Sequence, residues 1–308
     1  MQTIIGAGGT IDNPLARELK NYADKIRLVS RNPQQINGTD ELLSADATDA
    51  AALDKAVEGS EIVYCNIGFN YSVKAWRETW PPFIRNLTES CLKHNAKLVF
   101  FDNVYMYSPD SISHMTESSP IGPVSKKGKI RNEVAKIIEA AGARGLNWII
   151  ARSADFYGPD NRQSVLIETV WKNIKSGKKA QWLGDASKIH TYTYTPDAAK
   201  ATALLGNTAD AYNQVWHLPT SKEKVTGKDW VKLFAEASGG KPGVQVAAPW
   251  LVKVMSWFMP VMAEIHEMLY QNTQDYVFLS DKFEERFPDF KITEPAEGVS
   301  EIVRSETT

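Results

Sequence analysis

Short apolar runs alternate with longer amphipathic stretches along the first half of the chain. The predicted strands are Gln2–Ile5, Lys25–Ser30, Ile62–Asn66, Lys97–Phe101 and Asn147–Arg152. The predicted helices between them are Leu15–Tyr22, Ala50–Val57, Trp80–His94 and Ile130–Ala141. Continuous apolar strands that alternate with amphipathic helices are typical of a parallel sheet with helices on both faces. The pattern therefore predicts an α/β fold built on a doubly wound parallel sheet.

The pattern changes beyond Pro159, where helical stretches are joined by loops that contain proline and glycine. The predicted elements here are the helices Ser164–Ser176, Gly227–Ser238 and Trp250–Tyr270, and a strand-like run His190–Thr195 that leads into a helix over Asp197–Leu205. The polar tail from Glu294 is expected to be frayed. The stretch Trp250–Tyr270 is rich in Met, Trp and Phe, so we expect it to be packed inside the second half, with a partner or ligand surface as the alternative.

Composition excludes several classes of protein. Hydrophobic residues at 43% and charged residues at 23%, with a net charge of −2, describe an ordinary globular chain without a nucleic-acid surface. Cys65 and Cys91 form no CxxC pair, so we expect core cysteines in a reducing compartment and neither a disulfide framework nor a zinc site. The N-terminus shows no secretory signal, and Trp250–Met262 is too short and interrupted to span a bilayer. We therefore expect a cytoplasmic protein without a membrane partner.

A glycine-rich turn directly follows the first predicted strand. It includes Gly6, Gly8 and Gly9, continues through Thr10 and Ile11, and precedes the first predicted helix. Glycines let the backbone approach a pyrophosphate closely, and the N–H groups of the next helix can bind it. The third glycine of a dinucleotide-binding turn is missing, because Asp12 or Ile11 occupies its position, depending on the spacing used.

Asp12 is the main objection to a dinucleotide site. A carboxylate at the start of a helix suits the helix dipole but repels a bound pyrophosphate. In the alternative arrangement, Asn13 is the N-cap and Pro14 the first helical residue, so that the helix begins late and Asp12 points aside.

Further landmarks follow the glycine turn in a characteristic order. They are Ser30-Arg31, Asp46-Ala47, Asp102-Asn103 with Tyr105 and Tyr107, Lys129 with Glu133, Tyr157-Gly158-Pro159, and Tyr192 with Asp197. Together they resemble the extended short-chain dehydrogenase/reductase superfamily, of the NAD(P)-dependent epimerase/dehydratase type, over nearly the whole chain. The resemblance implies a Rossmann domain over residues 1–160, to which the chain returns around 188–218, and a smaller C-terminal α/β substrate lobe formed mainly by residues 161–308.

The resemblance also implies where a cofactor is held. The expected cofactor-binding residues are Gly6, Gly8, Gly9, Thr10, Ile11, Ser30, Arg31, Asp46, Ala47, Asn66, Gly68 and Lys129. Ser30 and Arg31 stand where NAD-using members place an acidic residue. A hydroxyl and a guanidinium suit a 2′-phosphate instead, so NADP(H) is favoured and NAD(H) is the alternative. Asp46 has a second interpretation as a helix N-cap, although Thr48 and Asp49 are better placed for that role.

Catalytic members of the superfamily use a serine or threonine, a tyrosine and a lysine, and this chain departs from that set. Lys129 aligns with the lysine, but Ser125 stands at the position of the tyrosine and Asn103 at that of the serine. An aliphatic hydroxyl cannot replace a phenol as a proton donor near neutral pH. Tyr105 or a water is expected to carry the proton instead. Lys126 and Lys127 are expected to form a solvated turn, with the alternative that this cluster and Arg131 hold an acidic substrate or a cofactor phosphate.

Four aromatic or histidine residues are candidates for contact with a small-molecule substrate. Tyr71 and Trp76 follow the strand that ends near Asn66, and His190 precedes Tyr192. For Tyr71 and Trp76 the alternative is packing of a lid. No histidine has metal-ligand spacing with another, so no metal site is expected.

The sequence supports three functions. The first is an oxidoreductase or epimerase that transfers hydride at a carbonyl or secondary alcohol of a small molecule. The second is a non-catalytic NADP-binding sensor, which the absence of a tyrosine at position 125 favours. The third is a scaffold that has lost its cofactor, supported by Asp12 alone. The sequence does not identify the substrate, and it does not distinguish a monomer from a homodimer.

Overall fold

The computed structural model describes residues 1–161, 164–241 and 243–306. Contacts divide the chain into two compact units. Unit 1 consists of Met1–Met106, Lys127–Ser153 and Ala198–Leu218, and unit 2 consists of Tyr107–Lys126, Ala154–Asp197 and Pro219–Thr308. Unit 2 thus includes Tyr107–Lys126, which the sequence analysis places in the Rossmann domain.

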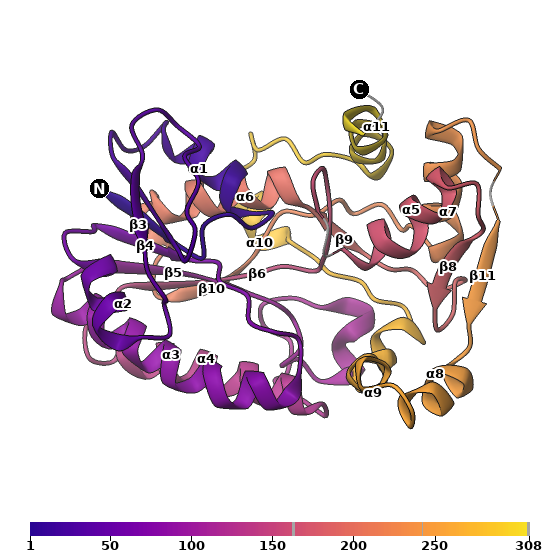
Figure 1. Ribbon diagram of the computed structural model, residues 1–308, viewed down its shortest axis with the longest axis horizontal. Coiled ribbons are helices and arrows are strands. Elements are labelled where there is room, and N and C mark those ends of the chain that lie inside the picture. The colour runs from indigo at the N-terminus through magenta and orange to yellow at the C-terminus, as the bar shows by residue number, and fades with distance from the viewer. Residues whose placement is uncertain (162–163, 242, 307–308) are drawn as a thin grey trace. The chain divides into compact units, whose positions relative to one another are not determined.

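Unit 1 contains a seven-stranded parallel sheet (Figure 1). Its strands are β1 (Gln2–Ile5), β2 (Ile26–Ser30), β3 (Glu41–Ser44), β4 (Ile62–Cys65), β5 (Lys97–Asp102), β6 (Trp148–Arg152) and β10 (Gln214–His217), in the order β10-β6-β5-β4-β1-β2-β3. The strand order reverses direction between β1 and β4, and in such sheets ligands bind at the carboxyl ends beside that point. The predicted doubly wound fold is confirmed.

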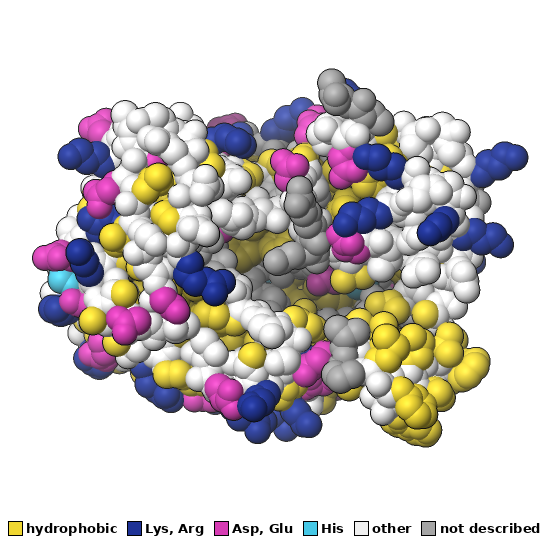
Figure 2. Space-filling model, in the orientation of Figure 1, with side chains coloured by type: hydrophobic (Ala, Val, Ile, Leu, Met, Phe, Trp, Pro, Cys, Tyr) yellow, Lys and Arg dark blue, Asp and Glu magenta, His cyan; other side chains and the backbone are white. Residues whose placement is uncertain are grey.

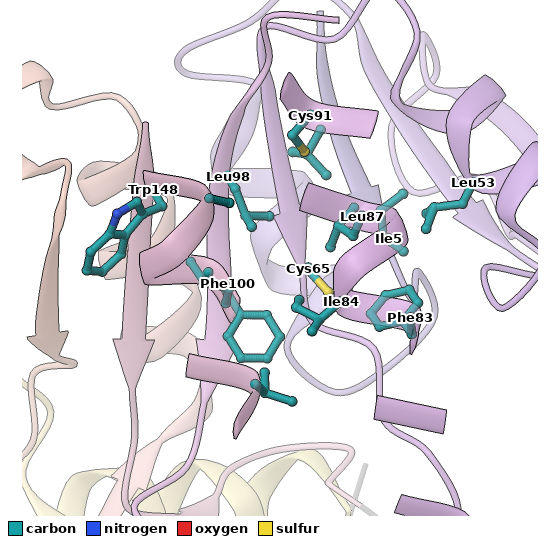
Figure 3. Packing of buried hydrophobic residues seen from close by; sticks show 14 of the residues in the cluster. Ile5, Leu53, Cys65, Phe83, Ile84, Leu87, Cys91, Leu98, Phe100 and Trp148 are labelled. Carbon is teal, nitrogen blue, oxygen red and sulfur yellow. The ribbon is translucent and has the colours of Figure 1, made fainter. Parts of the chain in front are cut away.

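Helices cover both faces of this sheet (Figure 1). They are α1 (Asp12–Leu19) and α6 (Thr195–Gly206) on one face, and α2 (Ala50–Val57), α3 (Val73–Lys93) and α4 (Lys126–Gly142) on the other. The α2–α4 face buries a large apolar cluster that includes Cys65, Leu87, Cys91 and Phe100 (Figure 3). The prediction that both cysteines are core residues is confirmed, and burial raises the pKa of the Cys65 thiol to about 12.

Two helices of unit 1 begin earlier than the apolar pattern predicts. Helix α3 begins at Val73 rather than at Trp80, because the Ser72 hydroxyl accepts a hydrogen bond from the Ala75 amide at 3.1 Å and caps it. The helix continues through Pro81 and Pro82, which the predicted range Trp80–His94 already included. Helix α4 begins at Lys126 rather than at Ile130, so the lysine cluster lies in its first turn.

Unit 2 is built from short elements. Its strands are β7 (Asp155–Tyr157) paired with β9 (Tyr192–Tyr194), and β8 (Ala180–Leu183) paired with β11 (Val244–Ala247). Its helices are α5 (Lys172–Lys175), α7 (Gly227–Ala237), α8 (Pro249–Ser256), α9 (Pro260–His266), α10 (Asp281–Arg286) and α11 (Pro295–Ser305), joined by the π-helical turn η2 (Ile167–Trp171) and the 3₁₀ turns η1 (Pro109–His114) and η4 (Leu269–Asn272). The 3₁₀ turn η3 (Ala209–Ala211) belongs to unit 1. Among the described residues, no helix has the length and apolar character needed to cross a bilayer.

The expectation of a frayed tail from Glu294 is wrong. Pro295–Ser305 forms α11, which buries Val299 and Ile302 in the core of unit 2. Its Glu301 carboxylate also accepts a hydrogen bond from the Tyr194 hydroxyl. The charged residues that suggested a solvated tail form the outer face of an amphipathic helix.

Candidate functional site

The glycine turn of unit 1 is shaped for a close backbone approach. Gly6 has φ +105°, and a Cβ atom there would lie 2.7 Å from Ile67 Cα, so this position requires glycine. Gly8 has φ +106°, with open space where its Cβ would be. The turn therefore holds β1 against the segment after β4 and leaves its outer side accessible. Both features fit the pyrophosphate of a dinucleotide.

Asp12 does not fit that role in its charged form. Helix α1 begins at Asp12, and its Oδ2 accepts a hydrogen bond from the Gly9 amide at 2.9 Å, so the alternative in which the helix begins late and Asp12 points aside is wrong. The side chain is buried, and its Oδ1 has no hydrogen-bond partner among the described residues. Burial raises the pKa of the carboxyl from 3.8 to about 7, against the opposing effects of Asn66 and the Gly9 amide.

Asn66 lies beside this carboxyl at the end of β4. Its amide nitrogen and oxygen are buried, and its interaction with the Asp12 carboxyl lowers the pKa of that carboxyl. Buried polar groups are normally paired. The buried polar atoms of Asp12 and Asn66 therefore mark the floor of the glycine turn as a place where a polar ligand group would be stabilised.

The predicted ribose and adenine residues lie at the ends of β2 and β3. Arg31 is exposed directly after β2, and its carbonyl accepts a hydrogen bond from the Ser44 hydroxyl at 2.8 Å. Asp46 accepts from the Thr48 amide and hydroxyl, which lowers the pKa of its carboxyl, whereas Asp49 caps α2. The helix-capping interpretation of Asp46 is therefore wrong.

An aromatic cluster with a buried cation lies at the ends of β4 and β5. The hydroxyls of Tyr71 and Tyr105 are 3.5 Å apart, and Tyr105 stacks on Trp76 with ring centroids 6.2 Å apart. Nζ of Lys127 lies 4.5 Å from the centroid of the Tyr71 ring. Lys127 is fully buried, so the expectation of a solvated turn is wrong for this residue.

Lys129 lies on the other side of α4. Its side chain is exposed, whereas Lys127 shares the buried stripe of the helix with Arg131 and Val134. The sequence alignment with the superfamily favours Lys129, but the helix turns Lys127 toward the sheet. Lys127 thus contacts the aromatic cluster at the strand ends, whereas Lys129 is open to solvent.

Asn103 is held in a tight turn after β5. Its Oδ1 accepts a hydrogen bond from the backbone amide of Tyr105 at 3.0 Å, and its own backbone amide donates to Asp102 Oδ1 at 2.9 Å. The same Asp102 oxygen accepts from Arg131 Nε at 2.7 Å, and both side chains are buried. The ion pair therefore fixes the backbone that presents Asn103 and Tyr105.

The remaining candidates lie in unit 2. His190 is buried, bonds to Asp155 Oδ2 at 2.9 Å and stacks on Tyr276 at a centroid distance of 4.4 Å. Tyr192 is buried beside it, and burial raises the pKa of its phenol. Both side chains contribute to the aromatic core of this unit. No group of three or more His, Cys, Asp or Glu residues in the described chain could hold a metal.

Sequence reasoning missed one contact in unit 2 because it joins residues far apart in the chain. Tyr270 in η4 hydrogen-bonds to the side chain of Ser125, while burial raises the pKa of its phenol. The nearby Glu267 accepts a hydrogen bond from the Lys126 amide at the start of α4. A phenol thus lies against the residue that replaces the usual tyrosine.

A comparison with known protein families shows to which family this chain belongs. Residues 3–217 match the NAD dependent epimerase/dehydratase family. This chain belongs to that family. The glycine turn, the seven-stranded sheet and the polar strand ends of unit 1 all lie within the matched region, so this family member shares the nucleotide-binding half of the fold.

Individual relatives of this family member are distant. It is 24% identical over 268 residues to a 3beta-hydroxysteroid-dehydrogenase/decarboxylase isoform 2 of Arabidopsis thaliana, covering 81% of this chain. The chain spans about half the length of that protein, at 47%.

Solved structures share the fold at low identity. MoeE5 in complex with UDP-glucose and NAD has a TM-score of 0.80 at 18% identity, covering 100% of this chain and 99% of that chain. UDP-N-acetylglucosamine 4-epimerase from Bacillus cereus has a TM-score of 0.78 at 16% identity, covering 99% and 96%. DesIV, a dTDP-glucose 4,6-dehydratase from Streptomyces venezuelae with NAD and DAU bound, has a TM-score of 0.79 at 18% identity, covering 99% and 96%.

Proposed function

We propose that this chain is an NAD(P)-dependent oxidoreductase or epimerase that transfers hydride at a carbonyl or secondary alcohol of a small molecule. The observation that carries the proposal is the cluster of Tyr71, Tyr105 and buried Lys127 at the carboxyl ends of β4 and β5. A bound nicotinamide dinucleotide supplies or accepts the hydride. The residues that would hold it are those of the glycine turn and Asn66.

Side chains of unit 1 would bind the substrate oxygen, transfer its proton and stabilise the charge that develops. Because Asn103 Oδ1 already accepts from the Tyr105 amide, its NH₂ group is the part that can donate to a substrate oxygen. Tyr105 gives a proton to that oxygen on reduction and takes it on oxidation. The Lys127 cation stabilises negative charge as it develops on the paired tyrosine hydroxyls. Trp76 packs against both tyrosine rings and holds them in place.

Cofactor choice follows from the end of β2, where Ser30 and Arg31 replace an acidic residue. NADPH is expected to bind at least about tenfold more tightly than NADH, because a charge-assisted phosphate contact contributes roughly 1.5–3 kcal/mol. Arg31→Asp is expected to reduce or reverse this preference. Thermal-shift titration with NADPH, NADP, NADH and NAD measures both, since a ligand that binds the native state raises its stability.

Lys55→Asp on α2 is the matched control, because it makes the same charge change at another exposed site. It should leave the preference intact. Equal affinities of the unaltered protein for NADPH and NADH would overturn the NADP assignment and favour NAD, the dinucleotide bound in MoeE5 and DesIV. Failure of all four dinucleotides to bind would overturn the proposed function.

The proton carrier is tested by removing single hydroxyls. Tyr105→Phe is expected to lower turnover by roughly a hundredfold or more while cofactor affinity is retained, because acid–base assistance contributes about 10²–10⁴. Reduction of bound cofactor by nucleotide sugars and by hydroxysteroids, followed by nicotinamide absorbance, provides the assay. Tyr22→Phe is the control, since Tyr22 is exposed near the end of α1. Unchanged turnover in Tyr105→Phe would exclude Tyr105, and a loss confined to Tyr270→Phe would assign the proton to Tyr270.

A non-catalytic NADP-binding sensor is the second candidate. Ser125 at the usual tyrosine position favours it, because the usual proton donor is then missing while the glycine turn is retained. A sensor would bind a dinucleotide and show no turnover with either substrate class, so the same two experiments separate it from the enzyme.

A further inference from the structure

Helix α8 of unit 2 and the turn that leads into α9 present a large apolar surface to solvent. Trp250, Trp257 and Phe258 are 68%, 71% and 79% exposed, and Leu251, Val254 and Met259 are between 38% and 44% exposed. We name these six residues the α8–α9 tip. Figure 2 shows it as a continuous hydrophobic area at the lower right, where Figure 1 places α8 and α9. The expectation of buried packing is therefore wrong for this part of Trp250–Tyr270.

The tip is a defined structure rather than a loose end. Val252 on α8 is buried, as are Met268 and Leu269 after α9, so both sides of the tip are anchored in unit 2. Trp250, Val254 and Trp257 are spaced so that they share one face of α8 and its extension. Trp257 and Phe258 then occupy the turn before α9, where exposure is greatest. The apolar surface is thus convex and peaks at a turn.

The size and shape of the tip argue against a second copy as its occupant. The three aromatic side chains present roughly 300–500 Å² and the other three are less than half exposed, so the tip stays below the about 800 Å² per partner of a standard protein interface. A convex tip would also need an apolar pocket on the other copy. A surface cavity of about 310 Å³ is lined by Asp54, Glu89 and Lys93 and does not suit it.

The chemistry of the tip matches the interfacial layer of a bilayer. Tryptophan and phenylalanine are the residues with which peripheral proteins enter the boundary between headgroups and acyl chains. Lys253 is the one charged residue between Trp250 and Met259, so a deformable apolar medium can close around the tip without desolvating other charges. Helices of eight and seven residues can lie in this layer but are far shorter than the about 20 residues that span a membrane.

We propose that the α8–α9 tip inserts into the surface of a phospholipid bilayer and attaches this chain peripherally to membranes. Attachment depends on apolar insertion and not on anionic headgroups, because Lys253 is the single cation in the segment that carries the tip. This mode needs no membrane-spanning segment, and it departs from the expectation of a protein without a membrane partner. The inference is independent of the proposed hydride transfer, since none of its residues belongs to that cluster.

Flotation of the full chain with vesicles tests the proposal. The chain should float with vesicles of phosphatidylcholine alone and of phosphatidylcholine mixed with phosphatidylserine, to similar extents and with little effect of salt. Trp257→Gln combined with Phe258→Gln should weaken binding by roughly tenfold or more. Tyr22→Gln combined with Leu42→Gln removes two exposed apolar side chains from unit 1 and should bind as the unaltered chain does.

Quenching by brominated lipids provides a measurement that does not depend on the double variant folding. Tryptophan fluorescence of the unaltered chain should be quenched on binding, and Trp250→Phe combined with Trp257→Phe should retain flotation but lose most of the quenching. Absence of flotation with both vesicles would overturn the proposal, as would binding that requires phosphatidylserine and survives the double variant. So would a dimer in sedimentation that the double variant converts to a monomer, because the tip would then join two copies.

Discussion

Asp12→Asn is expected to raise the free energy of unfolding at about pH 8 by on the order of 4 kcal/mol and to leave it nearly unchanged at about pH 4. The folded-state pKa of Asp12 is raised from 3.8 to about 7, so between these values the native chain holds a proton that the unfolded chain has lost. Stability therefore falls as pH rises through this window, and the loss is complete above the folded-state pKa. Asparagine keeps an acceptor for the Gly9 amide but cannot ionise.

Denaturant unfolding at a series of pH values measures this difference. Asp24→Asn is the control, because Asp24 is exposed after α1 and its replacement should not produce the same pH-dependent gain. A difference between Asp12→Asn and the unaltered chain that stays constant from acid to alkaline pH would contradict the burial of an ionisable carboxyl at the glycine turn.

The same carboxyl should control dinucleotide affinity. Above about pH 7 its charge would oppose a pyrophosphate bound at the glycine turn, and below that pH it would be neutral. Asp12→Asn is therefore expected to tighten dinucleotide binding at alkaline pH more than at acid pH. A variant that binds no better at either pH would show that the pyrophosphate does not approach Asp12.

Lys127→Met is expected to weaken dinucleotide binding by roughly tenfold and to lower turnover by about a hundredfold or more. Lys127 is buried beside the Tyr71 ring, so its removal takes a positive charge away from the tyrosine pair while methionine fills a similar volume. Titration of cofactor fluorescence and the nicotinamide absorbance assay measure the two effects.

Lys129→Met supplies the matched control for this experiment. It makes the same substitution two residues away on the exposed face of α4 and should change binding and turnover by less than about twofold. If Lys129→Met abolished function while Lys127→Met did not, the superfamily alignment would identify the working lysine and the burial argument would be wrong.

The sequence by itself determined the architecture of unit 1. The strands Gln2–Ile5 and Ile62–Cys65 and the helix Ala50–Val57 follow the predicted ranges closely, because each is a local apolar pattern flanked by its own turn or cap. The glycine turn was also predicted, from the glycines that directly follow the first strand. The structure gives the reason for Gly6, because its positive φ and its contact with Ile67 leave no room for a side chain. Local chemistry sufficed wherever the deciding contacts lie within a few residues.

Burial and long-range contact decided what the sequence could not. The alignment favours Lys129, yet the start of α4 at Lys126 places Lys127 on the stripe that faces the sheet. Extending the helical pattern back from Arg131 and Val134 would have revealed this. No local signal links Tyr270 to Ser125, and none shows that Trp257 is exposed while Val252 is buried. Whether a side chain is buried or exposed depends on which surfaces the folded chain brings together. The hydrophobicity of a residue alone does not specify this.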